Sequence, residues 1–342
     1  MNMKYLITGG AGFIGSHFVE LQKSKGNDSV VLDGLYTGGH LENLENLAGI
    51  GKVDFVKGDI RDGELVSSIL QKHKVDYVVH FAAESHVDRS ITGPIGFVDT
   101  NMLGTAVLLQ CAREYWESLG SEKKNTFRFL QVSTDEVFGE LGNTGYFTET
   151  TPYDPRSPYS ASKAGADHLV RAWNHTYGLP TLITNCSNNY GPRQLPEKLI
   201  PRMIQCALLE MPLPVYGKGE NIRDWIFVKD HCSGIDRALN QAAPGSTYCF
   251  GGRAERKNID LVNGLCAILD EIKPRSNGKK YVELIEFVED RLGHDWRYAI
   301  DDSKAERELG FERSVDFENG LRATVEWYLS NQNWATKVME KN

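Results

Sequence analysis

The chain has 342 residues, of which 41% are hydrophobic and 25% are charged, and its formal net charge is −8 at pH 7. This composition is typical of a globular protein, and the length suggests two domains or one large α/β domain with an elaborated end. The acidic balance excludes the basic surface that binds nucleic acid, so we expect no nucleic-acid partner. Any phosphorylated ligand must be held by a few well-placed arginines and lysines.

The cysteines and the N-terminus indicate a cytoplasmic protein. None of the six cysteines belongs to a CxxC pair or has zinc-ligand spacing with a histidine, so we expect buried thiols, a reducing compartment and no metal site. They are Cys111, Cys186, Cys206, Cys232, Cys249 and Cys266. The N-terminal segment enters an apolar strand without a signal-peptide pattern. No run reaches the ~18 apolar residues of a membrane span, so we expect no membrane partner.

Short apolar runs alternate with helical stretches along the first two-thirds of the chain. The runs are rich in Val, Ile, Leu and Phe with little alternation, as in strands that are buried on both faces of a parallel sheet. Helical spacing is clear over residues 97–116 and 159–177. Strands that alternate with helices predict an α/β fold, here a Rossmann-type doubly wound parallel sheet. The predicted strands are 4–8, 29–33, 53–57, 76–81, 127–133 and 181–186.

The second part of the chain has a different character. From about Gly191, proline and glycine become more frequent and the elements become shorter. We therefore predict an NAD-binding Rossmann domain with the catalytic residues over 1–190, and a smaller lobe over 191–330 that mainly binds substrate. The remaining segment, 331–342, is polar apart from Trp334 and Val338, and we expect it to be a frayed tail.

A glycine-rich turn follows the first predicted strand. Gly9 allows a tight turn, Gly12 lets the backbone approach a pyrophosphate, and Gly15 lets the next helix pack close to the strand. That helix begins around Phe13 and Ile14, where free N–H groups face the phosphates. A purely structural turn is the alternative, but a strand before the glycines and a helix after them favour a dinucleotide site.

Further cofactor contacts follow the next strands. Asp33 ends the second predicted strand, where a carboxylate binds the adenosine ribose hydroxyls and repels the 2′-phosphate of NADP, so the pattern favours NAD. Asp59 and Ile60 suit an adenine contact, with a simple turn as the alternative. Ala82 and Ala83 place small residues beside the cofactor, with strand-end packing as the alternative.

A tyrosine and a lysine start the 159–177 helix. Tyr159 and Lys163 are four residues apart and therefore share one helix face. A lysine ammonium beside a phenol lowers the pKa of the phenol, and the tyrosine can then act as a base near neutral pH. An exposed amphipathic face is the alternative, but the preceding Rossmann half favours a reactive pair.

The fifth predicted strand ends in a hydroxyl and two carboxylates, Thr134, Asp135 and Glu136. This strand end lies at the same crevice as the glycine turn, where Thr134 can bind a reacting sugar oxygen. Hydride transfer alone does not need two carboxyl groups, whereas acid–base elimination does. On local sequence alone, a solvated acidic turn remains the simpler interpretation.

These motifs together resemble the nucleotide-sugar branch of the extended short-chain dehydrogenases, and within it the dTDP-glucose 4,6-dehydratases. The resemblance extends over residues 4–329. The Thr-Asp-Glu triplet is the mark of this family, because related epimerases and decarboxylases lack the Asp-Glu pair and GDP-mannose dehydratases have Thr-Ser-Glu. It is carried by segments 8–16, 58–62, 82–94, 133–139, 157–163, 185–193, 221–230 and 290–301.

The resemblance implies NAD as the cofactor, a nucleotide-sugar substrate with dTDP-glucose as the first choice, and a homodimer formed through helices 97–116 and 159–177. It implies that Tyr159 takes the proton of the glucose 4-hydroxyl, that Lys163 holds the phenolate and the nicotinamide ribose, and that Thr134 polarises the C4 oxygen. Glu136 would remove the C5 proton, and Asp135 would protonate the departing C6 hydroxyl. Ser187 is implied as a cofactor contact, and the implied substrate contacts are Ser85, Asn185, Asn188, Arg223, Asn258 and Arg291.

The sequence departs from the family pattern in three segments, 34–40, 139–147 and 290–297, which border the adenosine, the carboxylates and the nucleotide. The base preference therefore stays open between thymidine, uridine and other nucleotides. A UDP-glucose 4,6-dehydratase and a UDP-sugar 4-epimerase or decarboxylase are the alternative enzymes. A non-catalytic dinucleotide-binding sensor is the alternative from another class, although it would be expected to have lost Tyr159 or Lys163.

Overall fold

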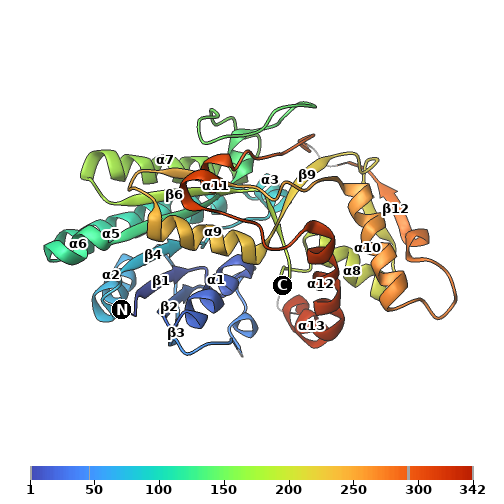
Figure 1. Ribbon diagram of the computed structural model, residues 1–342, viewed down its shortest axis with the longest axis horizontal. Helices are drawn as coiled ribbons and strands as arrows, with labels where there is room; N and C mark the ends of the chain where they lie inside the picture. Colours follow the sequence, from blue (N-terminus) through green and yellow to red (C-terminus); the bar gives the residue numbers. More distant parts are fainter. Residues whose placement is uncertain (1, 46, 291–292, 341–342) are drawn as a thin grey trace.

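A seven-stranded parallel sheet forms the centre of the structure, a computed structural model that describes residues 2–45, 47–290 and 293–340 (Figure 1). The strand order is β10-β6-β5-β4-β1-β2-β3, and every neighbouring pair is parallel. This order confirms the predicted Rossmann-type doubly wound fold. The strands are β1 (Lys4–Thr8), β2 (Asp28–Asp33), β3 (Val53–Lys57), β4 (Tyr77–His80), β5 (Arg128–Thr134), β6 (Thr181–Cys186) and β10 (Thr247–Phe250).

Helices cover both faces of the sheet. Successive residues of a strand point to opposite sides, so the apolar strands need helices on both faces to bury their side chains. In β1, Ile7 packs with helices α1, α9 and α11, whereas Leu6 packs with helices α2, α5 and α7. This two-sided burial explains why the strands are continuously apolar. The helices are α1 (Phe13–Ser24), α9 (Val228–Gln241) and α11 (Ser303–Leu309) on one face, and α2 (Gly63–His73), α5 (Thr105–Ser118) and α7 (Pro158–Tyr177) on the other.

One continuous helical run, Pro94–Ser118, joins α4 (Pro94–Phe97), a π-helical segment η2 (Val98–Gly104) and α5. By length and composition alone it could cross a membrane, although no apolar run of that length was predicted from the sequence. It packs against α2 and α7, and 44% of its apolar window is buried. A helix that is packed against a sheet in this way is typical of a globular core.

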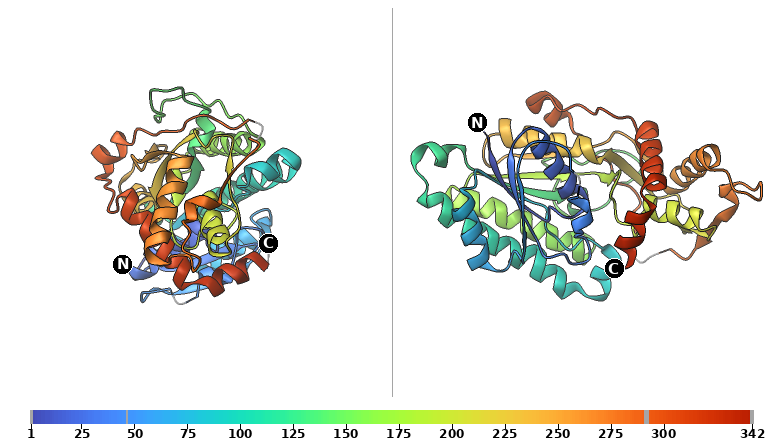
Figure 2. Two further views of the ribbon diagram at one scale, coloured as in Figure 1. Left: turned by 90° about the vertical axis from the view of Figure 1, so that its right-hand side faces the viewer. Right: turned by 90° about the horizontal axis from the view of Figure 1, so that it is seen from below.

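A second hydrophobic core lies beyond one end of the sheet (Figures 1 and 2). It is built from α8 (Leu199–Leu208), α10 (Asn258–Ile272), α12 (Phe317–Ser330) and α13 (Gln332–Glu340), a two-stranded sheet of β8 (Leu213–Tyr216) and β12 (Ile285–Val288), and a three-stranded sheet of β7 (Asn188–Tyr190), β9 (Ile222–Phe227) and β11 (Glu255–Lys257). Short elements complete the chain: η1 (Leu41–Asn43), α3 (Val87–Thr92), α6 (Ser121–Thr126), η3 (Asp135–Phe138) and η4 (Tyr281–Leu284).

The chain passes between these two parts more than once. Elements α9, β10 and α11 lie within the predicted 191–330 lobe, yet they complete the central sheet and cover one of its faces. The expectation of a frayed tail is wrong for 332–340, which form α13. Ala335 and Val338 of this helix are buried at 1% and 0% exposure, and Trp334 contacts Trp327 of α12 edge-on at 4.9 Å between ring centroids.

Candidate active site

The glycine-rich turn between β1 and α1 can be built only from residues without a side chain. Gly9 has a φ of +69°, and a Cβ there would lie 2.5 Å from the backbone nitrogen of Ala82. A Cβ on Gly15 would lie 2.3 Å from the carbonyl oxygen of Gly9. Gly12 is the N-cap of α1 and offers no side-chain cap, so the first N–H groups of Phe13 and the following residues remain available to an anion. The cradle therefore fits the pyrophosphate of a dinucleotide.

Asp33 lies at the C-terminal end of β2 beside this turn. Its carboxylate accepts hydrogen bonds from the backbone N–H groups of Ala11 (3.0 Å) and Leu35 (2.9 Å), and burial raises its pKa. The two hydrogen bonds fix the carboxylate at the strand end, and each oxygen keeps a further lone pair for a ribose hydroxyl. The position predicted for Asp33 from the sequence is thus the position that the structure shows.

The other predicted cofactor residues surround the same edge of the sheet. Asp59 accepts hydrogen bonds from Arg61 and Tyr36, and these partners lower its pKa to about 2, with Arg61 the main cause. Ile60 is 5% exposed and packs in a hydrophobic cluster of the core. Ala82 and Ala83 follow β4, where the Ala82 N–H contacts the Thr8 hydroxyl at 3.4 Å.

Tyr159 and Lys163 lie in the first two turns of α7, next to the end of β5. Ser157 begins this helix with a reciprocal capping box to Ser160, which fixes where the first turn starts. Both reactive residues are buried, at 9% and 5% exposure. The Lys163 ammonium donates a hydrogen bond to the Val132 carbonyl (2.9 Å), so helix and strand are held together at the site.

The pKa of Tyr159 differs from the sequence prediction. Burial raises it well above the ordinary value, the Glu136 carboxylate adds to the rise, and the Thr134 hydroxyl opposes it by hydrogen bonding. Burial also lowers the pKa of Lys163. The prediction that the lysine lowers the phenol's pKa is therefore wrong, because desolvation and a nearby carboxylate both disfavour the phenolate.

Thr134, Asp135 and Glu136 form the end of β5 and the start of η3. The Thr134 hydroxyl accepts a hydrogen bond from the Glu136 N–H (3.2 Å) and donates one to Asp135 Oδ1 (3.3 Å). Asp135 is 2% exposed, and its Oδ2 has no hydrogen-bond partner among the described residues. Burial raises the pKa of Asp135 well above its ordinary value, and the charges of Glu136 and Asp224 add to this rise. A neutral Asp135 can donate a proton.

Three residues that were not predicted from the sequence support Lys163. Asp167, one helical turn further along α7, is fully buried and accepts hydrogen bonds from Ser133 (2.7 Å) and Tyr153 (3.0 Å). Its charge favours the ammonium form of Lys163. The spacing of Asp167 on the Tyr159 face was a detectable signal, whereas nothing local to Ser133 or Tyr153 indicated this contact.

Asn101 is a further residue that the sequence did not reveal. Its side chain donates to the Ser162 hydroxyl of α7 (2.8 Å) and accepts from the Glu84 N–H (2.9 Å). It therefore joins the loop after β4, which carries Ala82 and Ala83, to the helix of Tyr159. The π-helical segment that contains Asn101 has no pattern that separates it from an ordinary helix.

The predicted substrate residues near the strand ends occupy different environments. Asn185, at the end of β6, donates to the Thr134 carbonyl (3.0 Å) and so touches the reactive triplet. Ser187 bonds through its N–H to the Phe250 carbonyl (3.1 Å), and Asn188 begins β7. Ser85 is exposed, and its carbonyl accepts from Lys198 (3.2 Å).

Arg223 and Asn258 lie further into the lobe. The Arg223 guanidinium stacks on Tyr298, 4.3 Å from the ring centroid, and donates to the carbonyl of Asp295 (2.8 Å). The side-chain oxygen of Asn258 is buried and has no hydrogen-bond partner within the part of the chain that the structure describes. Arg291 lies outside the described residues.

A doubly wound sheet with a glycine cradle, an aspartate at the end of β2, and a buried Tyr-x-x-x-Lys pair beside β5 define a dinucleotide-dependent enzyme of the short-chain dehydrogenase type. Residues 6–324 match the family model described as GDP-mannose 4,6 dehydratase. The chain belongs to this family of nucleotide-sugar dehydratases, as the motifs indicated.

Relatives and solved structures agree with this assignment. The dTDP-glucose 4,6-dehydratase of Xanthomonas campestris pv. campestris (strain B100) is 56% identical over 336 residues, which cover 98% of this chain and 96% of that protein. The dTDP-glucose 4,6-dehydratase 1 of Escherichia coli (strain K12) is 53% identical over 346 residues, with 98% and 95% covered. The dTDP-glucose 4,6-dehydratase DesIV of Streptomyces venezuelae, solved with NAD bound, superposes with a TM-score of 0.87 at 43% identity, covering 98% of this chain and 100% of that chain.

An epimerase shares the fold at a greater distance. The UDP-glucose 4-epimerase of Thermotoga maritima has a TM-score of 0.84 but only 28% identity, with 96% of this chain and 100% of that chain covered. The fold alone therefore does not separate the two activities. The higher identity to dehydratases favours the dehydratase interpretation over the epimerase alternative.

Proposed function

We propose that this chain is an NAD-dependent hydro-lyase that converts dTDP-glucose to dTDP-4-keto-6-deoxyglucose. The observation that carries the proposal is the buried carboxyl group of Asp135, whose Oδ2 has no hydrogen-bond partner among the described residues, beside Glu136 and Tyr159. Oxidation at C4 requires the tyrosine and lysine, whereas removal of water from C5 and C6 requires an additional acid and base. The relatives that are named dTDP-glucose 4,6-dehydratases support the choice of substrate.

The first half of the reaction uses the tyrosine. Tyr159 takes the proton of the glucose 4-hydroxyl, and the Thr134 hydroxyl binds the same oxygen. NAD, held by the glycine-rich turn and Asp33, would supply the hydride chemistry at C4 and C6. The oxidised nicotinamide carries a positive charge, and because a nearby cation favours the phenolate, bound NAD would offset the burial that raises the pKa of Tyr159.

The second half uses the two carboxyl groups. A 4-ketone makes the C5 proton acidic, and Glu136 removes it. Asp135, kept neutral by burial, donates a proton to the departing C6 hydroxyl, which leaves as water. Glu136 then returns a proton to C5. The low exposure of Asp135 and Tyr159 also excludes bulk water from the alkene that forms between the two steps.

The nucleotide and sugar contacts are part of the same proposal. Asn185 touches the triplet and Asn188 begins β7, while Arg223 lies in β9 and Asn258 begins α10 of the lobe. Arginine suits a diphosphate because its guanidinium binds two oxygens at once. UDP-glucose is the second candidate substrate.

Mass spectrometry of the product tests this function. The purified protein is incubated separately with dTDP-glucose and UDP-glucose, without added NAD. We expect a product that has lost one water from dTDP-glucose, formed faster than from UDP-glucose. A sugar nucleotide of unchanged mass that is inverted at C4 would support the epimerase alternative and remove the roles assigned to Asp135 and Glu136.

We also propose that the chain forms a homodimer through the helical run Pro94–Ser118 and α7. The run exposes apolar side chains at Ile95 (71%), Val98 (43%) and Leu103 (53%), and a second copy would bury them. Sedimentation of Leu103→Asp should show a monomer, whereas Ile50→Asp, at an exposed isoleucine on a distant loop (93%), should sediment like the wild type. Equal sedimentation of all three proteins would exclude this face.

Six free cysteines support a reducing compartment such as the cytoplasm.

A further inference from the structure

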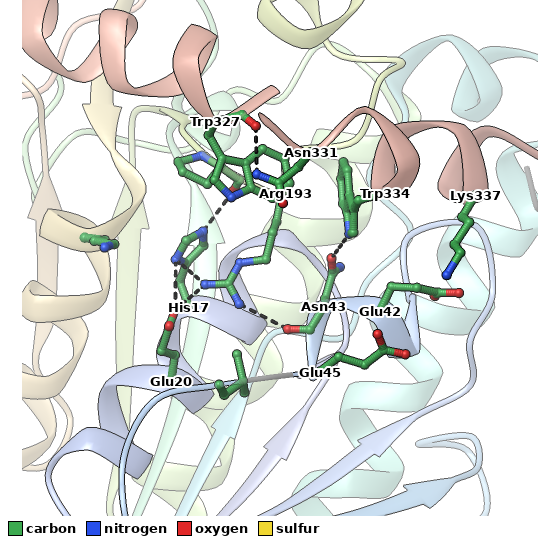
Figure 3. Close-up of a pocket in the computed structure, with 13 residues that line it drawn as sticks. His17, Glu20, Glu42, Asn43, Glu45, Arg193, Trp327, Asn331, Trp334 and Lys337 are labelled. Carbon is green, nitrogen blue, oxygen red and sulfur yellow. Dashed lines mark hydrogen bonds and ion pairs between the residues drawn. The ribbon is translucent and has the colours of Figure 1, made fainter. Parts of the chain in front are cut away.

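The side chain of Asn43 joins the C-terminal helix to the glycine-rich turn. Asn43 ends η1 and is 1% exposed. Its Nδ2 donates to the carbonyl of Ala11, inside the Gly9–Gly12 turn, at 2.8 Å. Its Oδ1 accepts from the indole N–H of Trp334 in α13 at 2.9 Å (Figure 3). One amide group therefore connects the two segments directly.

Both backbone groups of Ala11 are fixed by these contacts. Its N–H donates to Asp33 (3.0 Å), and its carbonyl also accepts from the His40 N–H (3.0 Å). The orientation of this peptide sets the direction of the N–H groups that follow at the N-terminus of α1. The residues proposed to hold the cofactor's phosphates and its ribose thus share one hydrogen-bonded unit with Asn43.

The backbone of Asn43 is held from a third direction. Arg193 donates to the Asn43 carbonyl (3.1 Å) and to His17 Nδ1 (2.9 Å), and it forms an ion pair with Glu20 of α1. These groups line a cavity of about 390 Å³ between α1, η1 and the helices α12 and α13, which Figure 3 shows. Because Arg193 holds its backbone, Asn43 cannot move with Trp334 or with Ala11 alone.

We infer that Asn43 and Trp334 are positioning residues for NAD, through which α13 holds the glycine-rich turn in its binding conformation. The inference rests on the proposed use of NAD. Neither residue contacts the reacting atoms. Their effect is to restrict the turn before the cofactor binds, and a restricted site loses less conformational freedom on binding. Without the indole N–H, the Asn43 amide can rotate, and the Ala11 carbonyl loses a fixed donor.

Trp334→Phe removes the indole N–H while keeping an aromatic ring against Trp327 and Tyr328. Trp327→Phe is the matched control, because Trp327 belongs to the same aromatic cluster but its side chain makes no hydrogen bond to any described residue. The measurement is the rate at which the purified holoenzyme exchanges bound NAD for isotopically labelled NAD. Loss of one neutral hydrogen bond predicts release that is faster by about two- to tenfold in Trp334→Phe.

Further readouts separate positioning from general damage. The urea midpoints of the two variants should be similar. Amide hydrogen exchange should rise in the Gly9–Gly12 turn of Trp334→Phe but not of Trp327→Phe. In an Asn43→Ala background, Trp334→Phe should have no further effect on the rate of NAD release. Equal NAD release from Trp334→Phe and Trp327→Phe would overturn the inference. A wild-type protein that neither retains nor binds NAD would instead contradict the proposed function.

Discussion

Replacement of Asp135 by asparagine should stop the elimination while making the fold more stable. Asparagine has the same shape but cannot donate a carboxylic proton to the C6 hydroxyl. General acid catalysis contributes about 10²- to 10⁴-fold, so kcat should fall by this factor, equivalent to about 3 to 5 kcal/mol of barrier. The oxidation at C4 does not involve Asp135, so it should still occur.

The stability should change in the opposite direction. Burial raises the pKa of Asp135, which means that the native state holds this proton more tightly than the unfolded state. The stability that such a group contributes to the native protein is lost as pH rises from the unfolded pKa through the folded pKa. At neutral pH the wild type must take up a proton on Asp135 when it folds, whereas asparagine is neutral in both states, so Asp135→Asn should unfold at a higher urea concentration than the wild type.

Rapid mixing with dTDP-glucose tests both halves of the reaction at once. The near-ultraviolet absorbance of reduced nicotinamide should appear and persist in Asp135→Asn, while mass spectrometry finds no dehydrated product. The control is Asp154→Asn, a carboxylate whose side chain is 76% exposed, which should turn over like the wild type. Turnover of Asp135→Asn at the wild-type rate, or a loss of activity accompanied by lower stability, would exclude Asp135 as the neutral general acid.

Two other perturbations give separate tests. Tyr159→Phe should bind NAD as the wild type does but lose C4 oxidation by about 10²-fold or more, because it lacks the proton acceptor; reduced-cofactor absorbance at the wild-type rate would contradict this role. His80 forms hydrogen bonds with Thr8 (2.7 Å) and Thr105 (3.0 Å), and burial lowers its pKa to about 3, so it is neutral in the native state. Its contribution to stability is therefore lost as pH falls from the ordinary histidine pKa toward 3. His80→Gln should reduce the slope of unfolding free energy against pH by about 1.4 kcal/mol per unit between about pH 6 and pH 4 in urea titrations, and an unchanged slope would show that His80 is protonated in the native state.

The parts of the site that the sequence predicted are those set by local geometry. Gly9 and Gly15 are required because a Cβ would collide with backbone in a tight turn, and that requirement acts within a few residues. Tyr159 and Lys163 are related by helix spacing, which is visible in any sequence. Thr134 was placed by the rule that the ends of parallel strands share one edge of the sheet.

The parts that the sequence missed depend on contacts between distant segments. The link between Asn43 and Trp334 joins residues that are 291 positions apart, and the expectation of a frayed tail failed because α13 gains its stability from this packing. Strand β10 was missed because it is short and lies in the segment rich in proline and glycine. The predicted direction of the Tyr159 pKa was wrong because burial and the Glu136 carboxylate, which both depend on how the chain packs, raise it.

We propose that one site oxidises C4, eliminates water from C5 and C6, and reduces C6 with the same hydride. The most direct test is turnover of dTDP-glucose that carries deuterium at C4, with the product analysed by mass spectrometry and NMR. We expect a product that is one water lighter, with the deuterium in the new methyl group. Deuterium that remains at C4, or that is lost to solvent, would contradict it.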